Sequence, residues 1–214
     1  MGTPDFAVAS LDILVKNDYN IVAVITAPDK PAGRGRQLQQ SAVKKYAAEK
    51  GLNVLQPEKL KNEQFLEELK TLNADLQIVV AFRMLPEVVW NMPPLGTFNL
   101  HASLLPQYRG AAPINHAIIN GEKETGATTF FLKHEIDTGD ILFQEKVEIK
   151  EDETAGELHD KLMEIGAGLV LNTVQKIETG DYSTIQQKSI AKEEEIKHAP
   201  KIFKEDCKIN WENS

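Results

Sequence analysis

The chain has 214 residues, of which 42% are hydrophobic, and it carries a formal net charge of -8. A chain of this size can bury one sizeable core, and the negative charge argues against a general binder of nucleic acid or membrane surfaces. The single cysteine, Cys207, excludes an internal disulfide, no Cys/His spacing indicates a zinc site, and no apolar run reaches the ~20 residues that span a bilayer. These features favour a cytoplasmic protein without a metal.

The N-terminal residues predict a helix that follows a loop. Thr3 suits an N-cap and Pro4 suits the first helical position, so we expect a helix from here to about Lys16. A βα unit normally places a strand before such a turn. We therefore expect that the first strand is missing before Met1 and that the sheet has an open slot beside its neighbour. That neighbour is the apolar run 21–26, which predicts a buried parallel strand.

A basic segment follows at residues 27–36, where Pro and Gly alternate with positive charge. Its composition predicts an exposed, mobile loop. Lys30, Arg34 and Arg36 place three cations in a chain that is otherwise acidic, and such a cluster can meet phosphate groups. The alternative is a solvated loop that only keeps the protein soluble.

Helices and strands continue to alternate up to residue 180. Helices are predicted over residues 41–50, 63–72 and 113–119. Pro86 opens a brief helix, and a capping box at Thr154 begins a helix that runs to about Glu178. Strands are predicted over residues 53–55, 76–82, 126–132 and 141–149, and from Thr97 onward. This order predicts an α/β fold with a doubly wound, mostly parallel sheet and helices on both faces. After residue 180 the apolar periodicity is lost. We expect a main domain over 1–180, a linker over 181–197 and the start of another unit over 198–214.

A polar pair lies on the strand that begins at Thr97. Asn99 and His101 are two residues apart, so both side chains point to the same face of the sheet. A turn bounded by Pro and Gly follows, and the carboxyl ends of parallel strands are where ligands collect. Asp137, in the acidic turn 137–140, supplies a carboxylate that can hold the tautomer of an imidazole and raise its basicity. The end of this strand is therefore the candidate active site.

These residue types leave two possibilities open. One is an acid/base enzyme in which an amide stabilises an oxyanion, and the other is a nucleotide-binding module whose polar residues only position a ligand. A histidine near a strand end is more often structural than catalytic, and an Asp/Gly turn is ordinary turn chemistry. The sequence contains neither a Gly-x-Ser-x-Gly elbow nor a Gly-x-Gly-x-x-Gly fingerprint, which disfavours an α/β-hydrolase and a dinucleotide enzyme.

Six segments, in this order along the chain, resemble the methionyl-tRNA formyltransferases. They are Met-Gly-Thr-Pro-Asp-Phe-Ala-Val (1–8), Pro-Asp-Lys-Pro-Ala-Gly-Arg-Gly-Arg (28–36), Leu-Gln-Pro-Glu-Lys-Leu (55–60), Asn-Leu-His-Ala-Ser-Leu-Leu-Pro-Gln-Tyr-Arg-Gly-Ala-Ala-Pro-Ile (99–114), Ile-Asp-Thr-Gly-Asp-Ile-Leu (136–142) and Glu-Thr-Ala-Gly-Glu-Leu-His-Asp-Lys-Leu (153–162). The resemblance implies a Rossmann-like formyltransferase domain. It also implies transfer of a formyl group from 10-formyltetrahydrofolate to the amino group of methionyl initiator tRNA, in translation initiation.

The resemblance assigns roles to residues of this sequence. It implies that Asn99 and His101 donate hydrogen bonds to the oxyanion of a tetrahedral intermediate, and that His101 and Asp137 move a proton through water. This chemistry requires no metal and no covalent intermediate. The implied folate-binding residues are Ser103, Leu104, Leu105 and Pro106 after the strand, together with Phe82, Arg83 and Met84. The last three lie in a segment, 81–86, that is similar to the folate side of glycinamide ribonucleotide formyltransferase and replaces the more usual Ala-Tyr-Gly.

The resemblance also concerns the partners of the protein. With tRNA as the implied substrate, the three cations Lys30, Arg34 and Arg36 are predicted to contact its acceptor stem. No stable protein partner is implied, and we expect a monomer. The family carries a C-terminal β-barrel that helps to hold tRNA, so residues 198–214 are expected to begin a truncated tRNA-binding domain. Two alternatives remain: a formyltransferase of the same fold that acts on a small amine such as glycinamide ribonucleotide, and a folate-binding module without turnover.

Overall fold

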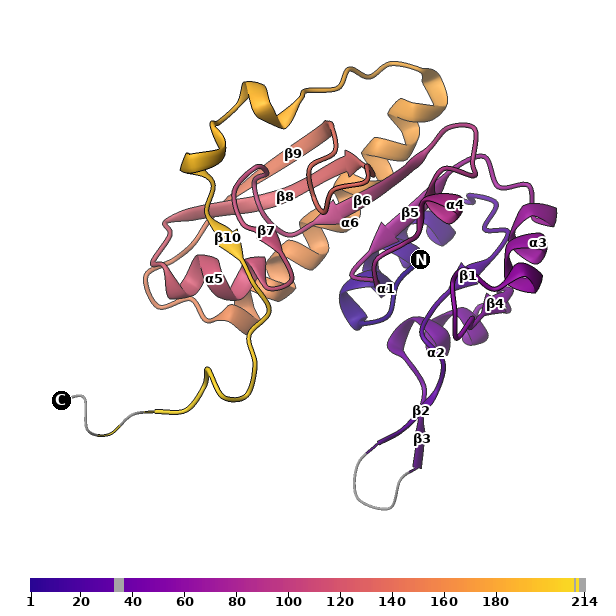
Figure 1. The fold of residues 1–214 in the computed structure, drawn as a ribbon, viewed down its shortest axis with the longest axis horizontal. Helices are drawn as coiled ribbons and strands as arrows, with labels where there is room; N and C mark the ends of the chain where they lie inside the picture. The colour runs from indigo at the N-terminus through magenta and orange to yellow at the C-terminus, as the bar shows by residue number, and fades with distance from the viewer. Residues whose placement is uncertain (33–36, 210, 212–214) are drawn as a thin grey trace.

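The sheet that positions the site consists of β5 (Gln77–Val80), β6 (Thr97–His101), β8 (Glu124–Phe131) and β9 (Ile141–Glu148), hydrogen-bonded in that order (Figure 1). The computed structural model describes residues 1–32, 37–209 and 211. The predicted α/β class is confirmed. β5 and β6 are parallel, whereas β8 is antiparallel to both β6 and β9. β8 and β9 depart from the expected parallel arrangement. They are antiparallel to each other because their connection is too short for a helical crossover.

A second pair of strands, β1 (Val24–Ile25) and β4 (Val54–Leu55), is parallel and shorter than the sequence predicts. The first two residues of the chain join this pair to the main sheet. The Gly2 N–H donates to the carbonyl at the end of β1 at 3.0 Å, and the Met1 carbonyl accepts from the Val80 N–H at 2.9 Å. The N-terminus therefore lies between β1 and β5.

Helices cover both faces of the sheet, as predicted. Successive residues of a strand point to opposite faces, and the apolar side chains on each face pack against helices. Val80 packs in one hydrophobic core and Val79 in another. The Val80 core includes residues of α1 (Asp5–Lys16), α2 (Ala42–Glu49), α5 (Pro113–Ile119) and α6 (Ala155–Thr179), and the Val79 core includes residues of α3 (Glu63–Thr71) and α4 (Glu87–Trp90). Among the described residues, no helix combines the length and the apolar character needed to cross a membrane.

Capping side chains determine where several helices begin. Thr154 and Glu157 form the predicted capping box of α6, in which each side chain accepts from the backbone N–H of the other residue. Ser41 and Asn62 cap α2 and α3 in the same way, with one bond each. α1 begins one residue later than predicted, because the backbone of Pro4 is extended and this residue takes the N-cap position without a side-chain bond.

The described part of the basic segment includes a β-strand. β2 (Lys30–Ala32) and β3 (Gln37–Gln39) form an antiparallel pair where the sequence analysis expected a loop. The two strands form because each satisfies backbone hydrogen-bonding groups of the other. The predicted cations Arg34 and Arg36 lie outside the described residues.

The segment after α6 runs back beside β9 and β7 (Arg109–Gly110) (Figure 1), with Ile185 bridged to Ile141. It contains two short 3-10 turns, η1 (Gln187–Ser189) and η2 (Glu193–Glu195), and ends in β10 (His198–Ala199). β10 pairs in parallel with β7, which follows the candidate active-site turn. β10 belongs to residues 198–214, which were expected to begin another unit. The predicted linker, 181–197, also contacts the candidate site, because the Lys197 carbonyl accepts from the Tyr108 N–H.

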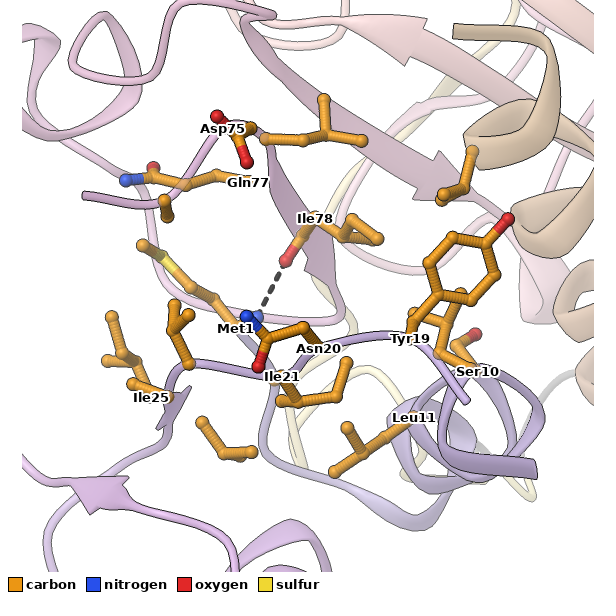
Figure 2. Close-up of a pocket in the computed structure, with 18 of the residues that line it drawn as sticks. Met1, Ser10, Leu11, Tyr19, Asn20, Ile21, Ile25, Asp75, Gln77 and Ile78 are labelled. Atoms are coloured by element: carbon orange, nitrogen blue, oxygen red, sulfur yellow. Dashed lines mark hydrogen bonds between the residues drawn. The ribbon is translucent and has the colours of Figure 1, made fainter. Parts of the chain in front are cut away.

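A cavity of about 870 Å³ opens beside Met1, between β1 and β5 (Figure 2). Its lining is largely apolar and includes Leu11, Ile21 and Ile78. Ser10 also lines it, and no described residue pairs with the buried Ser10 hydroxyl. The cavity lies where the sequence analysis expects an open slot. That a strand belongs there stays a prediction.

Candidate active site

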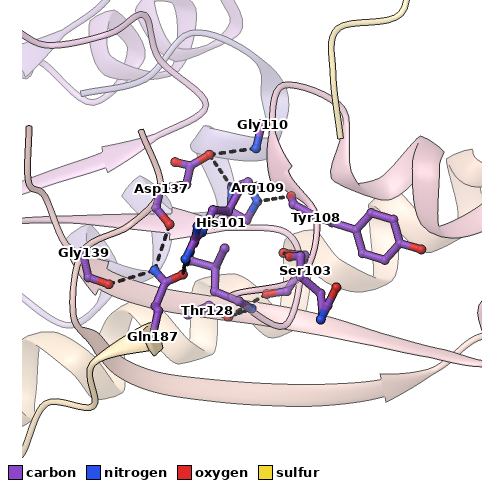
Figure 3. A network of polar contacts seen from close by, with 11 residues as sticks. His101, Ser103, Tyr108, Arg109, Gly110, Thr128, Asp137, Gly139 and Gln187 are labelled. Carbon is purple, nitrogen blue, oxygen red and sulfur yellow. Dashed lines mark hydrogen bonds and ion pairs between the residues drawn. The ribbon is translucent and has the colours of Figure 1, made fainter. Parts of the chain in front are cut away.

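The polar pair lies in the carboxyl-terminal part of β6, before the chain turns towards β7. Figure 3 shows His101 with the groups around it. His101 is the last residue of β6 and lies opposite Thr128 of β8, and Asn99 lies opposite Phe130. The alternation of the strand gives both side chains the same face. His101 is only 7% exposed, so its ring is fixed by the groups around it.

The hydrogen bonds of His101 determine which ring nitrogen is available for chemistry. Its Nε2 atom lies 2.8 Å from the carbonyl oxygen of Tyr108. A carbonyl can only accept, so Nε2 carries a proton. In the neutral ring Nδ1 is therefore unprotonated, and it lies 3.9 Å from Oδ2 of Asp137. The structure brings together the imidazole and the carboxylate, as the sequence predicts, at a distance beyond direct hydrogen bonding.

The Asp137 carboxylate is held by the main chain on the far side of the turn. Its Oδ2 atom accepts a 2.9 Å hydrogen bond from the Gly110 N–H. The backbone of Asp137 is left-handed, with φ of 54°, a conformation that Asp tolerates better than most residues. Gly139 completes the turn, and a Cβ atom there would lie 1.6 Å from the Phe131 carbonyl oxygen. Only glycine fits this close approach.

Asn99 has a free hydrogen-bonding group. Its Oδ1 atom is buried, and no described residue pairs with it. Native proteins rarely leave a buried acceptor unpaired, because the unmade bond costs free energy. A ligand that donates to Asn99 would remove this cost. The orphaned oxygen therefore marks a place where a ligand with an N–H or O–H group fits.

The turn after β6 contains four of the predicted folate-binding residues. Ser103 Oγ donates to the Gln107 carbonyl at 2.6 Å, and Thr128 Oγ1 donates to the Ser103 carbonyl at 2.6 Å. Leu105 packs with Phe130 and Ile141, and Leu104 lies against Gly126. The Leu105-Pro106 peptide bond is cis. Three of the four side chains, those of Ser103, Leu105 and Pro106, are buried in the turn itself.

The other predicted folate-binding residues follow β5. Phe82 is half-buried, and Met84 is 72% exposed. The Arg83 guanidinium donates to the Glu58 carbonyl at 2.8 Å and also to the Pro57 carbonyl. Phe82 and Arg83 line a depression of about 450 Å³ together with Lys30. The structure thus places Lys30 beside this segment, whereas Asn99 and His101 do not line the depression.

Sequence reasoning missed three contributions to the site. The Tyr108 carbonyl holds His101, and Tyr108 has a left-handed backbone, with φ of 60°. The buried Arg109 guanidinium and Gln187 amide bond to each other within the network of Figure 3. These contacts involve main-chain atoms or residues distant in sequence, and periodicity carries no signal for either.

Comparisons with known proteins find relatives that match most of the chain. The family model described as Formyl transferase matches residues 1–174. The methionyl-tRNA formyltransferase of Bacteroides fragilis is 62% identical over 211 residues, which are 99% of this chain and 65% of that protein. The chain thus spans just under two thirds of the length of this relative.

Solved structures with the same architecture are also known. An N-formyltransferase from Helicobacter canadensis, in complex with folinic acid and dTDP-3-aminofucose, gives a TM-score of 0.67 at 25% identity and covers 98% of this chain and 70% of its own. Phosphoribosylglycinamide formyltransferase from Streptococcus pneumoniae gives a TM-score of 0.69 at 17% identity and covers 83% of this chain and 96% of its own. These neighbours confirm the Rossmann-like α/β fold.

Proposed function

The chain belongs to the formyl transferase family, and we propose that it transfers a formyl group from 10-formyltetrahydrofolate to the amino group of methionyl initiator tRNA. The observation that carries the chemistry is the position of the free His101 Nδ1 beside the Asp137 carboxylate. The choice of acceptor is supported by the 62% identity to the Bacteroides fragilis methionyl-tRNA formyltransferase. Such an enzyme would act in translation initiation, and we place it in the cytoplasm.

The proposed reaction passes through a tetrahedral intermediate with a negatively charged oxygen. The attacking amine must lose a proton, and the leaving N10 of the folate must gain one. His101 Nδ1 can accept the first proton, because Nε2 is already bonded to the Tyr108 carbonyl. The nearby Asp137 carboxylate stabilises the imidazolium that forms, and the protonated Nδ1 can then donate to the oxyanion or to N10.

Asn99 is suited to hold the reacting groups. Its amide nitrogen can donate to the formyl oxygen as negative charge develops there. Its buried Oδ1, which no described residue pairs with, can accept from the incoming amine. We propose that the turn at 103–106 and the residues Phe82, Arg83 and Met84 contact the folate.

The acceptor tRNA is proposed to contact the basic segment. Lys30, Arg34 and Arg36 together would give a salt dependence with a slope of about -2.7, at about -0.9 per phosphate contact on duplex. Arg34→Ala combined with Arg36→Ala should flatten the plot of tRNA affinity against salt and leave folate binding intact. Identical plots for the two proteins would place recognition elsewhere. We propose a monomer, which sedimentation can check.

A transfer assay with a labelled formyl donor tests the proposal. Methionyl initiator tRNA and glycinamide ribonucleotide are offered in separate reactions with the same enzyme and donor. We expect label on the tRNA. Label on glycinamide ribonucleotide alone would support the small-amine alternative, and donor binding without transfer to either acceptor would support a binding module.

A further inference from the structure

We propose that Gln187 is a positioning residue, which holds the turn that carries Asp137 in the geometry needed for proton transfer. This proposal rests on the proposed formyl transfer. Gln187 lies in η1, in the segment that the sequence analysis expected to be a linker, yet its side chain is only 2% exposed. It belongs to the network in Figure 3, where its amide bonds the main chain of Asp137 rather than the carboxylate.

The Gln187 amide uses all of its principal hydrogen-bonding positions. Its Nε2 atom donates to the Asp137 carbonyl and to the Gly139 carbonyl, both at 2.8 Å. Its Oε1 atom accepts from Nε and Nη2 of Arg109, at 3.0 and 2.9 Å. Carbonyls can only accept and a guanidinium can only donate, so this network fixes the orientation of the amide.

The two carbonyls that Gln187 binds, those of Asp137 and Gly139, belong to the turn that carries the Asp137 side chain. Asp137 has a left-handed backbone, and such conformations persist when surrounding contacts determine them. The Gly110 N–H holds the carboxylate, and Gln187 holds the main chain behind it. Together these bonds set the 3.9 Å separation between Asp137 Oδ2 and His101 Nδ1. Loss of the Gln187 donors would release one side of this arrangement.

The segment around Gln187 is attached to the domain by other contacts. Ile185 and Ile141 exchange two backbone hydrogen bonds, both of 2.9 Å. Arg109 pairs with Glu193 at 3.2 Å, and β10 pairs with β7. A substitution at Gln187 should therefore change the Asp137 turn without detaching the segment.

Three variants separate positioning from a general structural role. Gln187→Glu keeps the size of the side chain and the bonds from Arg109 but removes both donors to the turn. Gln187→Ala removes both sets of bonds. Gln186→Ala is the matched control, because Gln186 is the exposed neighbour in the same segment. Asp137→Asn removes the carboxylate charge directly, so its kinetics and NMR signals are the reference with which the Gln187 variants are compared.

The readouts are steady-state kinetics and the NMR signals of the His101 ring nitrogens and the Gly110 amide. For Gln187→Glu we expect kcat to fall about 10- to 100-fold, with KM for the folate donor nearly unchanged. We also expect the His101 signals to move and the Gly110 amide to exchange faster, with Gln186→Ala like the parent. Parental NMR signals and parental kcat in a folded Gln187→Glu protein would overturn the proposal.

Two further measurements keep the test decisive. If the Gln187 variants do not fold, through-hydrogen-bond couplings in the unmodified protein report on the same contacts. Couplings from the Gln187 side-chain nitrogen to the Asp137 and Gly139 carbonyl carbons support the proposal, and their absence overturns it. If the parent transfers no formyl group, the proposed function fails, while the NMR signals still test whether Gln187 positions the turn.

Discussion

His101 has one ring nitrogen bonded to the main chain and one directed towards a carboxylate. The Tyr108 carbonyl accepts a hydrogen bond from Nε2–H, and this bond leaves Nδ1 as the base in the neutral ring. Asp137 faces Nδ1 without bonding to it directly. The arrangement suits a group that must accept a proton and then release it.

Asn99→Ala should reduce kcat strongly with little loss of stability. The removal of one oxyanion donor typically lowers the rate by about 10²- to 10³-fold. Stability should change little, because no described residue pairs with Asn99 Oδ1 and no such bond is broken. Ser10→Ala is a suitable control, since the Ser10 hydroxyl is likewise buried without a described partner but lines the cavity near Met1.

The two variants can be compared by kcat and by thermal unfolding. Ser10→Ala should keep the parental kcat. A normal kcat in folded Asn99→Ala would remove Asn99 from the mechanism.

At the scale of elements, an ionic cluster ties the C-terminal segment to the active-site turn. Lys197 Nζ lies 2.5 Å from Glu122 Oε1, and the Tyr108 hydroxyl donates to the same oxygen. Burial alone would raise the pKa of Glu122, but the bonds from Lys197 and Tyr108 hold it below its ordinary value of 4.5. Burial, with the bond to Glu122, raises the pKa of Tyr108.

This cluster predicts a pH dependence of stability. A carboxyl with a lowered pKa in the folded state stabilises the protein above its unfolded pKa, and this contribution is lost as the pH falls through the folded value. The parent should therefore be more stable than Glu122→Gln at pH 7. The difference should decline below about pH 4.5 and vanish once Glu122 is protonated. Thermal midpoints between pH 3 and 7 check this, and a difference that is independent of pH would contradict it.

The elements differ in how far the sequence predicts them. The capping box of α6 and the Asn99 and His101 pair were predictable, because each depends on spacing within a single element. The packing of residues 181–200 was not, because polar side chains such as Gln187 make it through distant main-chain groups. The spacing of apolar residues along the sequence does not indicate such contacts. The antiparallel direction of β8 and β9 was not predicted either, because it depends on the length of the connection between them.

At the scale of the whole molecule, a cavity lies beside Met1, between β1 and β5. In a chain that begins at Met1, the Met1 amino group donates to the Ile78 carbonyl at 2.6 Å, and burial lowers the pKa of this group to about 5. A peptide N–H at this position could make the same bond without a charge. The free amine lets the unfolded state bind more protons between about pH 5 and 8, so stability should rise with pH across this window.

A strand fused before Met1 should stabilise the protein. We expect a short segment of alternating Val and Ile residues to pair with β1 and β5 and to cover apolar surface in the cavity. A Gly/Ser segment of the same length is the control. Each additional kcal/mol should raise the thermal midpoint by about 2–4 °C, and both fusions should lose the rise in stability between pH 5 and 8. Equal midpoints for the two fusions would show that the gap does not accept a strand.

The most direct test of the proposed chemistry is the rate of formyl transfer by Asp137→Asn with saturating donor and methionyl initiator tRNA. The amide keeps an oxygen that can accept from the Gly110 N–H, so the turn can persist while the charge beside His101 is lost. We predict parental donor binding and a rate reduced by about 100-fold or more, within the range of general acid–base catalysis. Transfer at the parental rate by the folded variant would contradict a role for the Asp137 charge.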